Sequence, residues 1–259
     1  MSAREPARPA SCAPRPRPSP QVPPEVLYQR QRRVPDRVNN SARRSYDLLR
    51  STLVSTGRNM PLVERELTDA LSASRNTVRA VLQQLARDGL VTRGPKNGTQ
   101  GTGSILLPFN ELVPLLQARM LECRPIACPP MVRDRLELPD GQTVIMIETL
   151  LLEDSRPVGL TVNYVALAEG RSPDLDLDEP DVILFIEQKL GINVMGSRTT
   201  AGAMAADHQT AELVGIDVGA PLLWVDDVIE GENGQPLALS QHRFRGDRVA
   251  FSAYASRSV

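Results

Sequence analysis

One helix signal, between Ser74 and Gly89, constrains the fold of this chain more than any other feature. Four apolar side chains recur there at i, i+3, i+4 and i+7, the spacing of one face of an amphipathic helix: Val78, Val81, Leu82 and Leu85. Serine is a favoured N-cap residue, and glycine commonly follows the last turn of a helix. We therefore predict a helix between these two residues, with an apolar face turned toward a core.

Two further helices and a hairpin are expected around it. Tyr46, Leu49 and Leu53 have the i, i+3, i+7 spacing of an amphipathic helix, and Pro61 precedes a helix with Leu67 and Leu71. Residues 72–73 form a tight break before Ser74. After Gly89, residues 90–93 and the glycine-rich stretch 94–103 fit a two-stranded wing. The order of these elements predicts a winged helix-turn-helix.

The first turns of the 74–89 helix carry side chains that suit DNA recognition, because this end of the second helix enters the major groove in such motifs. Arginine can bond guanine, and asparagine can bond adenine, in bidentate fashion. Hydroxyl groups suit phosphate oxygens or the thymine methyl group. The residues concerned are Ser74, Arg75, Asn76, Thr77 and Arg79. A plain helical hairpin with a solvated charged face is the alternative.

The charge is divided unequally along the chain. Residues 1–103 hold 18 Lys+Arg and 8 Asp+Glu, whereas residues 104–259 hold 12 and 23. Without the first 40 residues, the segment 41–103 still has ten basic and five acidic side chains. This asymmetry favours a polyanion-binding half joined to a half with another role, and it favours DNA binding over the plain hairpin.

The chain divides into four expected parts. Residues 1–40 contain nine prolines and little apolar periodicity, so we predict a disordered arm, in which residues 29–33 could contact the DNA backbone. The winged helix-turn-helix occupies 41–103, a linker 104–114, and an acidic domain of mixed strands and helices 115–259. The predicted fold class is α+β.

The N-terminal motifs resemble the DNA-binding domain of the GntR family of bacterial transcription regulators. Residues 60–67 resemble the family's Leu-Pro-Ser-Glu-Arg-Glu-Leu, 72–79 its Val-Ser-Arg-x-Thr-Val-Arg, and 85–91 its Leu-x-x-x-Gly-Leu-Ile. The wing departs from the usual Gly-x-Gly-Thr-Phe-Val. The resemblance implies DNA contacts by four helix side chains and by the wing: Arg65, Arg75, Thr77 and Arg79, with Lys96, Asn97, Gly98 and Thr99 near the minor groove.

The C-terminal half is similar to the UTRA effector domain of the HutC-like subfamily. Residues 141–158 resemble its strand, turn and returning strand, 211–223 its helix, loop and next strand, and 244–248 its closing Tyr-Arg-Gly-Asp-Arg. Residues 232–237 place Asn-Gly between two apolar runs, which is typical of a hairpin. The resemblance implies an antiparallel sheet with packed helices, like chorismate lyase, and a homodimeric repressor of a palindromic operator, released by a small-molecule effector.

The effector positions differ from those of phosphosugar-binding relatives. The resemblance places Thr149 and Leu151 where such relatives have an Arg-x-Arg pair that grips the phosphate. Replacing two cations by a hydroxyl and an isobutyl group removes charge-assisted bonds, so an uncharged, partly apolar ligand is expected. The implied site is Thr149, Leu151, Thr161, Asn163, Ala238 and Phe244. A shifted register and a vestigial pocket remain open alternatives.

No cofactor, metal or membrane span is expected. Cys123, Cys128, His208 and His242 do not have the spacing of a zinc site, and residues 174–185 lack the glycine and glutamate of an EF-hand loop. An acidic loop ending in a helix cap at Asp181 is the simpler interpretation. The chain has no 18-residue uncharged stretch. We expect a cytoplasmic, nucleoid-associated protein.

Three functions compete at this stage. The first is a ligand-responsive DNA-binding repressor, the second is a DNA-binding regulator that ignores small molecules, and the third is an enzyme related to chorismate lyase. The six implied effector residues carry no charge, which argues against catalysis, since acid–base chemistry needs titratable groups around a pocket.

Overall fold

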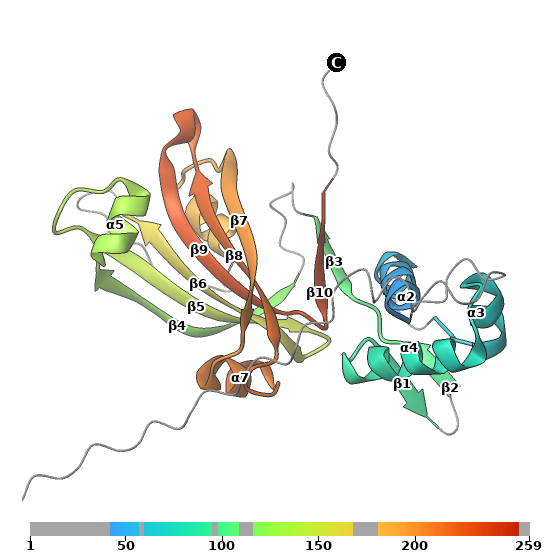
Figure 1. Ribbon diagram of the computed structural model, residues 1–259. Coiled ribbons are helices and arrows are strands. Elements are labelled where there is room, and N and C mark those ends of the chain that lie inside the picture. The colour runs from blue at the N-terminus through green and yellow to red at the C-terminus, as the bar shows by residue number, and fades with distance from the viewer. Residues whose placement is uncertain (1–41, 57–59, 95–97, 109–115, 168–180, 254–259) are drawn as a thin grey trace, which may run out of the picture.

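The computed structural model describes residues 42–56, 60–94, 98–108, 116–167 and 181–253, and Figure 1 shows them as two domains joined by a pair of strands. The predicted arm, residues 1–40, lies outside the described residues. No helix in the described ranges is long and apolar enough to span a membrane.

The N-terminal domain contains the predicted helices and wing, which are confirmed. Its elements are α2 (Ala42–Thr56), α3 (Glu64–Ala70), α4 (Arg75–Arg87), β1 (Val91–Gly94) and β2 (Gly98–Gly101). The two strands pair antiparallel. The apolar face predicted for the third helix lies in one core cluster with α2 and α3, and its four side chains are almost fully buried: Val78, Val81, Leu82 and Leu85.

Both predicted ends of α4 have the expected geometry. The Ser74 side chain accepts a hydrogen bond from the Thr77 backbone N–H at 3.1 Å, as an N-cap residue does. Gly89 has φ +74°, a left-handed conformation that costs glycine little. The backbone therefore leaves α4 sharply at Gly89 and enters β1, which sets the wing beside α4, here also called the recognition helix.

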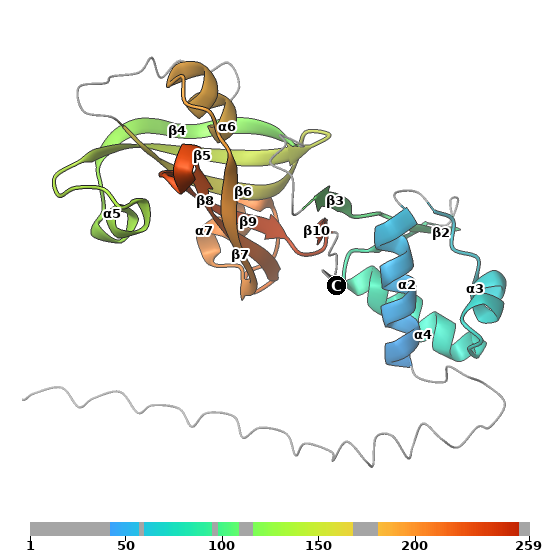
Figure 2. The ribbon, with the colours of Figure 1, turned by 90° about the horizontal axis from the view of Figure 1, so that it is seen from above.

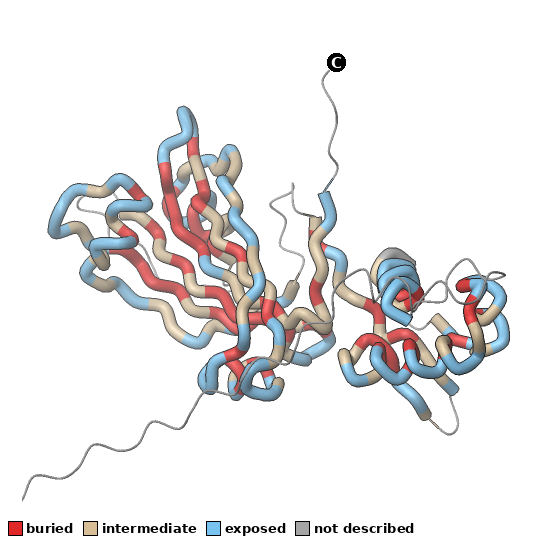
Figure 3. The backbone as a smooth tube through the Cα atoms, viewed as in Figure 1, coloured by how far each residue is buried: buried red, intermediate tan, exposed pale blue. Residues whose placement is uncertain are grey.

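The C-terminal domain is built on one six-stranded antiparallel sheet, in the order β4-β5-β6-β9-β8-β7. Its strands are β4 (Gln117–Ala127), β5 (Thr143–Glu153), β6 (Arg156–Ala166), β7 (Gly196–Ala205), β8 (Pro221–Glu230) and β9 (Pro236–Arg245). Figure 3 shows the most continuous burial along the strands that lie inside the sheet. A short helical turn, η2 (Glu232–Gly234), joins β8 to β9 where the Asn-Gly hairpin was predicted.

Helices cover both faces of this sheet. α5 (Pro130–Leu136) and α7 (His208–Val214) pack on one face, and α6 (Val182–Leu184) with the π-helical turn η1 (Phe185–Lys189) packs on the other, here called the front face. Figure 2 shows α6 on the side opposite α5 and α7. The predicted cap at Asp181 is present, since its carboxylate accepts hydrogen bonds from the backbone N–H groups of Ile183 and Leu184.

Two strands outside the sheet connect the domains. β3 (Ile105–Pro108) pairs in parallel with β10 (Val249–Ser252), and Figure 1 shows the pair between the two domains. The Ile105 N–H donates to the Arg248 carbonyl at 2.7 Å. The segment predicted as a linker, 104–114, therefore contains a strand, because a partner about 140 residues further along the chain satisfies its backbone.

Candidate DNA interface and effector site

The recognition helix separates its apolar and polar residues as predicted. Arg75, Asn76 and Arg79 are exposed on the first turns of α4, and Arg65 is exposed on α3. Ser74 and Thr77 are half-buried and hydrogen-bond to each other at 2.9 Å. Among the described residues, the Arg65 and Arg75 guanidinium groups have no hydrogen-bond or ion-pair partner. Their donors are therefore available for an external acceptor.

Arg79 differs from the other two arginines because it already has a partner. Its Nε lies 2.9 Å from the Glu64 Oε2 at the start of α3. Both side chains are largely exposed, so this ion pair adds little stability. Its effect is geometric: the pair ties the guanidinium to a fixed carboxylate and leaves the terminal nitrogens without a partner among the described residues.

The wing is held against the turn that precedes α3. The Leu62 N–H donates to the Thr99 carbonyl at 2.8 Å, and Pro61 forms an isolated bridge with Gln100. Gly98 is exposed, with φ +66°, at the start of β2. Lys96 and Asn97 lie outside the described residues. The described part of the wing thus has backbone contacts that fix its position relative to the helix-turn-helix.

A hydrogen bond between helices braces the far end of α4. The Tyr46 hydroxyl donates to the Asp88 carboxylate at 2.6 Å. Burial is the largest cause, and this hydrogen bond the second, of a pKa of Tyr46 raised to about 12, so the phenol remains a donor at neutral pH. Since the folded state holds this proton more tightly than the unfolded chain, that stabilisation is lost as pH rises from 10 toward 12.

We expect Tyr46→Phe to lower the free energy of unfolding by about 1–2 kcal/mol at pH 7, because it removes a hydrogen bond to a charged acceptor. Urea unfolding of the full chain measures this. Asp47→Ala is the matched control, since the ion pair that it removes, with Arg43, is exposed. An equal loss in both variants would show that the Tyr46–Asp88 bond is not a significant brace.

The implied effector residues all lie on strands of the C-terminal sheet, but the structure does not gather all six. Thr149 of β5 lies directly opposite Thr161 of β6, and Asn163 follows on the same face. Leu151 and Phe244 instead belong to an apolar cluster with β3 and β10, and Ala238 belongs to another with α6 and η1. The face thus has an apolar cluster at each end and three implied polar residues between them.

Between the two clusters runs a band of polar side chains, here called the polar band: Thr149, Thr161, Asn163, Ser197, Thr199, Asp227, Ser240 and His242. Thr161 Oγ1 lies 2.9 Å from His242 Nδ1, and His242 Nε2 lies 3.3 Å from an Asp227 carboxylate oxygen. Thr199 and Ser197 also hydrogen-bond to Asp227. Five members of the band, on β6, β7, β8 and β9, are therefore connected in one network: Thr161, Ser197, Thr199, Asp227 and His242.

Sequence reasoning identified Thr149, Thr161 and Asn163 but missed the other five residues of the polar band. His242 was assessed only as a metal ligand, together with His208 and two cysteines, and Asp227 and Ser240 were not considered. Alternation along β9 puts 238, 240, 242 and 244 on one face, a pattern visible in the sequence once that strand is known. The contact with Asp227 depends on strand register, which no local pattern specifies.

A stack of rings connects the polar band to the strands between the domains. The His242 ring stacks on Phe244, with centroids 5.6 Å apart and planes 10° apart. Phe244 meets Phe251 of β10 edge to face, with centroids 5.4 Å apart. β10 pairs with β3, the strand that follows the wing. The ring contacts from His242 through Phe244 to Phe251 therefore connect the polar band with that part of the chain.

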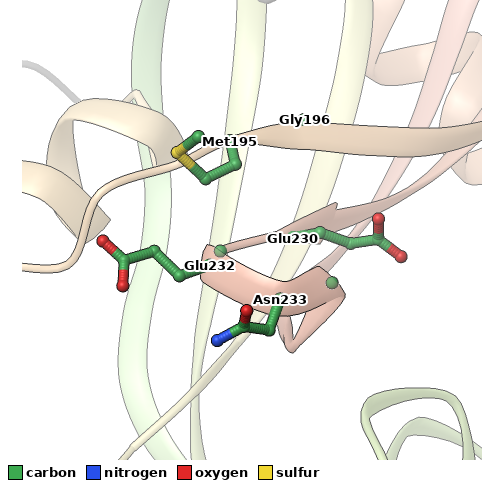
Figure 4. Close-up of a pocket in the computed structure, with 7 residues that line it drawn as sticks. Met195, Gly196, Glu230, Glu232 and Asn233 are labelled. Carbon is green, nitrogen blue, oxygen red and sulfur yellow. The ribbon is translucent and has the colours of Figure 1, made fainter.

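A separate open pocket lies at the β8–β9 turn, away from the implied effector residues, and Figure 4 shows its lining: Met195, Gly196, Glu230, Gly231, Glu232, Asn233 and Gly234. Glu230 is already paired with Arg198 at 2.5 Å. This pocket is shallow and formed largely by a turn, so it does not define a ligand site.

Metal chemistry finds no support in the described part of the chain, where no group of three or more metal-ligating side chains occurs. Cys123 and Cys128 are unpaired thiols there, and burial raises the pKa of both. A raised pKa keeps a thiol protonated, which makes it a poor nucleophile and a poor ligand.

Comparison with known families agrees with this architecture. Residues 42–100 match the family described as bacterial regulatory proteins, gntR family, and residues 116–250, more than half of the chain, match the UTRA domain. The chain belongs to the GntR family of transcription regulators and carries a UTRA domain. It is a DNA-binding transcription regulator, and the family implies a small-molecule effector. This membership favours regulation over the enzyme alternative.

Individual relatives are distant but extend over most of the chain. The HTH-type transcriptional regulator Rv0792c of Mycobacterium tuberculosis is 26% identical over 212 residues, 76% of this chain and 77% of the relative. The HTH-type transcriptional repressor NagR of Bacillus subtilis is 23% identical over 210 residues, which are 76% of this chain and 86% of NagR. The crystal structure of PhnF from Mycobacterium smegmatis has a TM-score of 0.58 at 22% identity, covering 83% of this chain and 100% of PhnF. The fold is therefore that of GntR-family regulators with a UTRA domain.

Proposed function

We propose that the chain is a homodimeric repressor that binds a palindromic operator through α4 and the wing and is released by a small molecule held in the C-terminal domain. Several relatives are named repressors, among them NagR and a probable repressor of a fructoselysine utilization operon in Escherichia coli. Such a protein acts on the nucleoid in the cytoplasm.

One observation carries the DNA-binding part: the guanidinium groups of Arg65 and Arg75, which have no partner within the described ranges, lie exposed on the two helices of the helix-turn-helix, with Asn76 and Arg79 beside them. Burying α4 by its apolar face leaves these donors on the surface that enters the major groove. Ser74 and Thr77 add hydroxyl groups for phosphate contacts. The proposed DNA interface also includes the wing residues Lys96, Asn97, Gly98 and Thr99.

The test of this part is the salt dependence of operator binding by the full chain. Contacts between cations and phosphates release counterions, so log Kd should rise linearly with log salt concentration. Removing one phosphate contact reduces the slope by about 1, whereas removing a base contact changes the preferred sequence. A slope near zero would contradict the proposal.

The effector part is supported by the position of the polar band. β9 carries Ser240, His242 and Phe244 and then enters the turn 245–248. Asp247 in this turn lies close to Gly89: a Cβ added to Gly89 would be 2.9 Å from the Asp247 carboxylate oxygen. Gly89 is the residue where the chain leaves α4. A ligand that displaces β9 would therefore move residues in contact with the end of the recognition helix, and unequal ligand affinity for two such arrangements changes DNA affinity.

An effector-independent regulator is the alternative. A thermal-shift screen of the full chain distinguishes the two, because a ligand that binds only the folded state raises the melting temperature. If operator binding is tight and no compound changes it or the melting temperature, the alternative is correct.

We expect the full chain to be a homodimer in solution, because one recognition helix reads too few base pairs for a specific operator. We propose that the six-stranded sheet domain forms the dimer interface, so the dimer should persist when residues 1–103 are removed. Multi-angle light scattering at micromolar concentration checks both proteins. A monomeric full chain would contradict the proposal, and a dimeric full chain with a monomeric fragment would move the interface to the N-terminal domain.

A further inference from the structure

We propose that the effector domain selects a ligand that donates hydrogen bonds, a neutral polyhydroxy compound or an amine, and that it rejects phosphate esters. This inference rests on the proposed effector function and names the chemical class of the ligand. It depends on two observations about the polar band: the hydrogen-bonding atoms that it leaves without a partner among the described residues, and the lack of Lys or Arg among its members.

With the His242 ring neutral, the hydrogen bonds from Thr161 to Asp227 run in one direction. An ionised carboxylate only accepts, so the Asp227 contact places the proton of His242 on Nε2. Nδ1 of the neutral ring is then an acceptor, and Thr161 donates its hydroxyl proton to it. In this arrangement only lone pairs of Thr161 Oγ1 remain for a ligand. This end of the network therefore presents an acceptor.

Asn163 adds a second acceptor, and Ser240 adds a hydroxyl that can both accept and donate. Asn163 uses its amide nitrogen in a 3.4 Å bond to the Ile147 carbonyl, and its Oδ1 has no hydrogen-bond partner among the described residues. Ser240 lies opposite Asn163 on β9, and its Oγ is also buried without such a partner. Both side chains are no more than 2% exposed. Buried polar atoms are nearly always paired, so these two mark a position for a polar ligand, which must donate to Asn163 Oδ1.

The polar band itself contains no Lys or Arg that could bind an anion. In the register of the six strands, the front-face arginine is Arg156, which starts β6 opposite Glu153 at the end of the sheet, and Asp227 is the carboxylate within the polar band. Arg243 and Arg245, the cations of β9, have partners on the opposite face, Asp207 and Asp247. A phosphate dianion placed here would lose its hydration without a charged partner, which is unfavourable.

The cover of the site explains how ligand binding could be transmitted. Ile147 and Ala238, which flank Asn163 and Ser240 on the same face, pack against Phe185 and Ile186 of η1. A ligand at the two oxygens would therefore lie next to η1. Displacement of this cover is the route by which we expect ligand binding to change the shape of the domain.

The test is a thermal-shift and calorimetry series on the full chain with matched pairs of probes. Each compound is compared with its own phosphate ester: glycerol, glucose, glucosamine and ethanolamine. We expect at least one unphosphorylated member to raise the melting temperature and to bind at least tenfold more tightly than its ester. A tighter phosphate ester, or no response from any pair, would overturn the inference.

Two variants test the residues. Ser240→Ala and Asn163→Leu should each weaken binding of the responding probe at least tenfold, while Gln241→Ala, an exposed neighbour on β9, should not. Because Ser240→Ala removes an unpaired buried hydroxyl, its ligand-free melting temperature should equal or exceed that of the unmodified chain. A clearly lower melting temperature would mean that the hydroxyl stabilises the fold, and the inference would fail.

Operator binding by the same preparations separates this inference from the proposed function. If a phosphate ester releases the operator, the repressor proposal stands and the ligand class is wrong. If no probe affects the operator but the chain binds it sequence-specifically, the effector part fails and the DNA-binding part stands.

Discussion

Arg75→Ala is expected to weaken binding to the operator by about 1–3 kcal/mol, which is about 5- to 150-fold in Kd. Arg75 is the first residue of α4, is exposed, and has no side-chain partner among the described residues, so nothing in the protein would replace its bonds to a base. Sequence preference should relax at the base pair that it contacts, and binding to other sequences should change much less. Fluorescence anisotropy with operator and scrambled duplexes measures both effects.

Arg87→Ala is the matched control for this prediction. Arg87 is an exposed arginine on the same helix, but it lies in the last turn, away from the end that enters the groove. Its removal should cost at most a small, sequence-independent loss from the reduced charge. Equal operator affinity for Arg75→Ala and the unmodified chain would show that α4 does not dock by its N-terminal turns.

The second large effect concerns stability. We expect Arg248→Ala to lower the free energy of unfolding by about 2–4 kcal/mol, because it removes the guanidinium that lies 2.8 Å from the Glu153 carboxylate. Glu153 is only 8% exposed, so its charge would remain in a poorly solvated position. Urea unfolding at pH 7 measures the change.

Arg198→Ala provides the comparison for this pair. Arg198 also bonds a glutamate, Glu230, but its own side chain is 63% exposed, and such surface pairs contribute about 0–1 kcal/mol. The double variant Arg248→Met, Glu153→Leu should regain much of the loss, since apolar residues of similar size avoid the buried charge. If Arg248→Ala and Arg198→Ala were equally mild, the buried pair would not be a structural link between the sheet and β10.

The N-terminal domain could be predicted from the sequence because its signals are local. The apolar spacing of residues 78–85, the Ser74 cap and the left-handed Gly89 each act within a few residues and agree with one another. The β3–β10 pair could not be predicted in the same way. Its two strands are short, lie far apart in the sequence, and pair in parallel, so no turn chemistry marks them.

The polar band was predicted only in part, and the reason is register. Thr149, Thr161 and Asn163 were identified by resemblance, and they do lie together. The partner of Thr161 is His242 of β9, 81 residues away, and His242 in turn contacts Asp227 of β8, so only the pairing of those strands brings the three side chains together. A histidine considered without its strand neighbours cannot be distinguished from an ordinary one.

Binding-site selection with the purified full chain tests the central claim most directly. The chain is mixed with a random duplex library, bound DNA is recovered over several rounds, and the enriched sequences are read. A dimer that presents two copies of α4 should enrich an inverted repeat whose half-sites are centred about one helical turn, roughly 10 base pairs, apart or a multiple of it. Arg75→Ala should lose preference at one base pair in each half-site. Enrichment of a single unrepeated site would contradict the dimer, and no enrichment at all would contradict sequence-specific DNA binding.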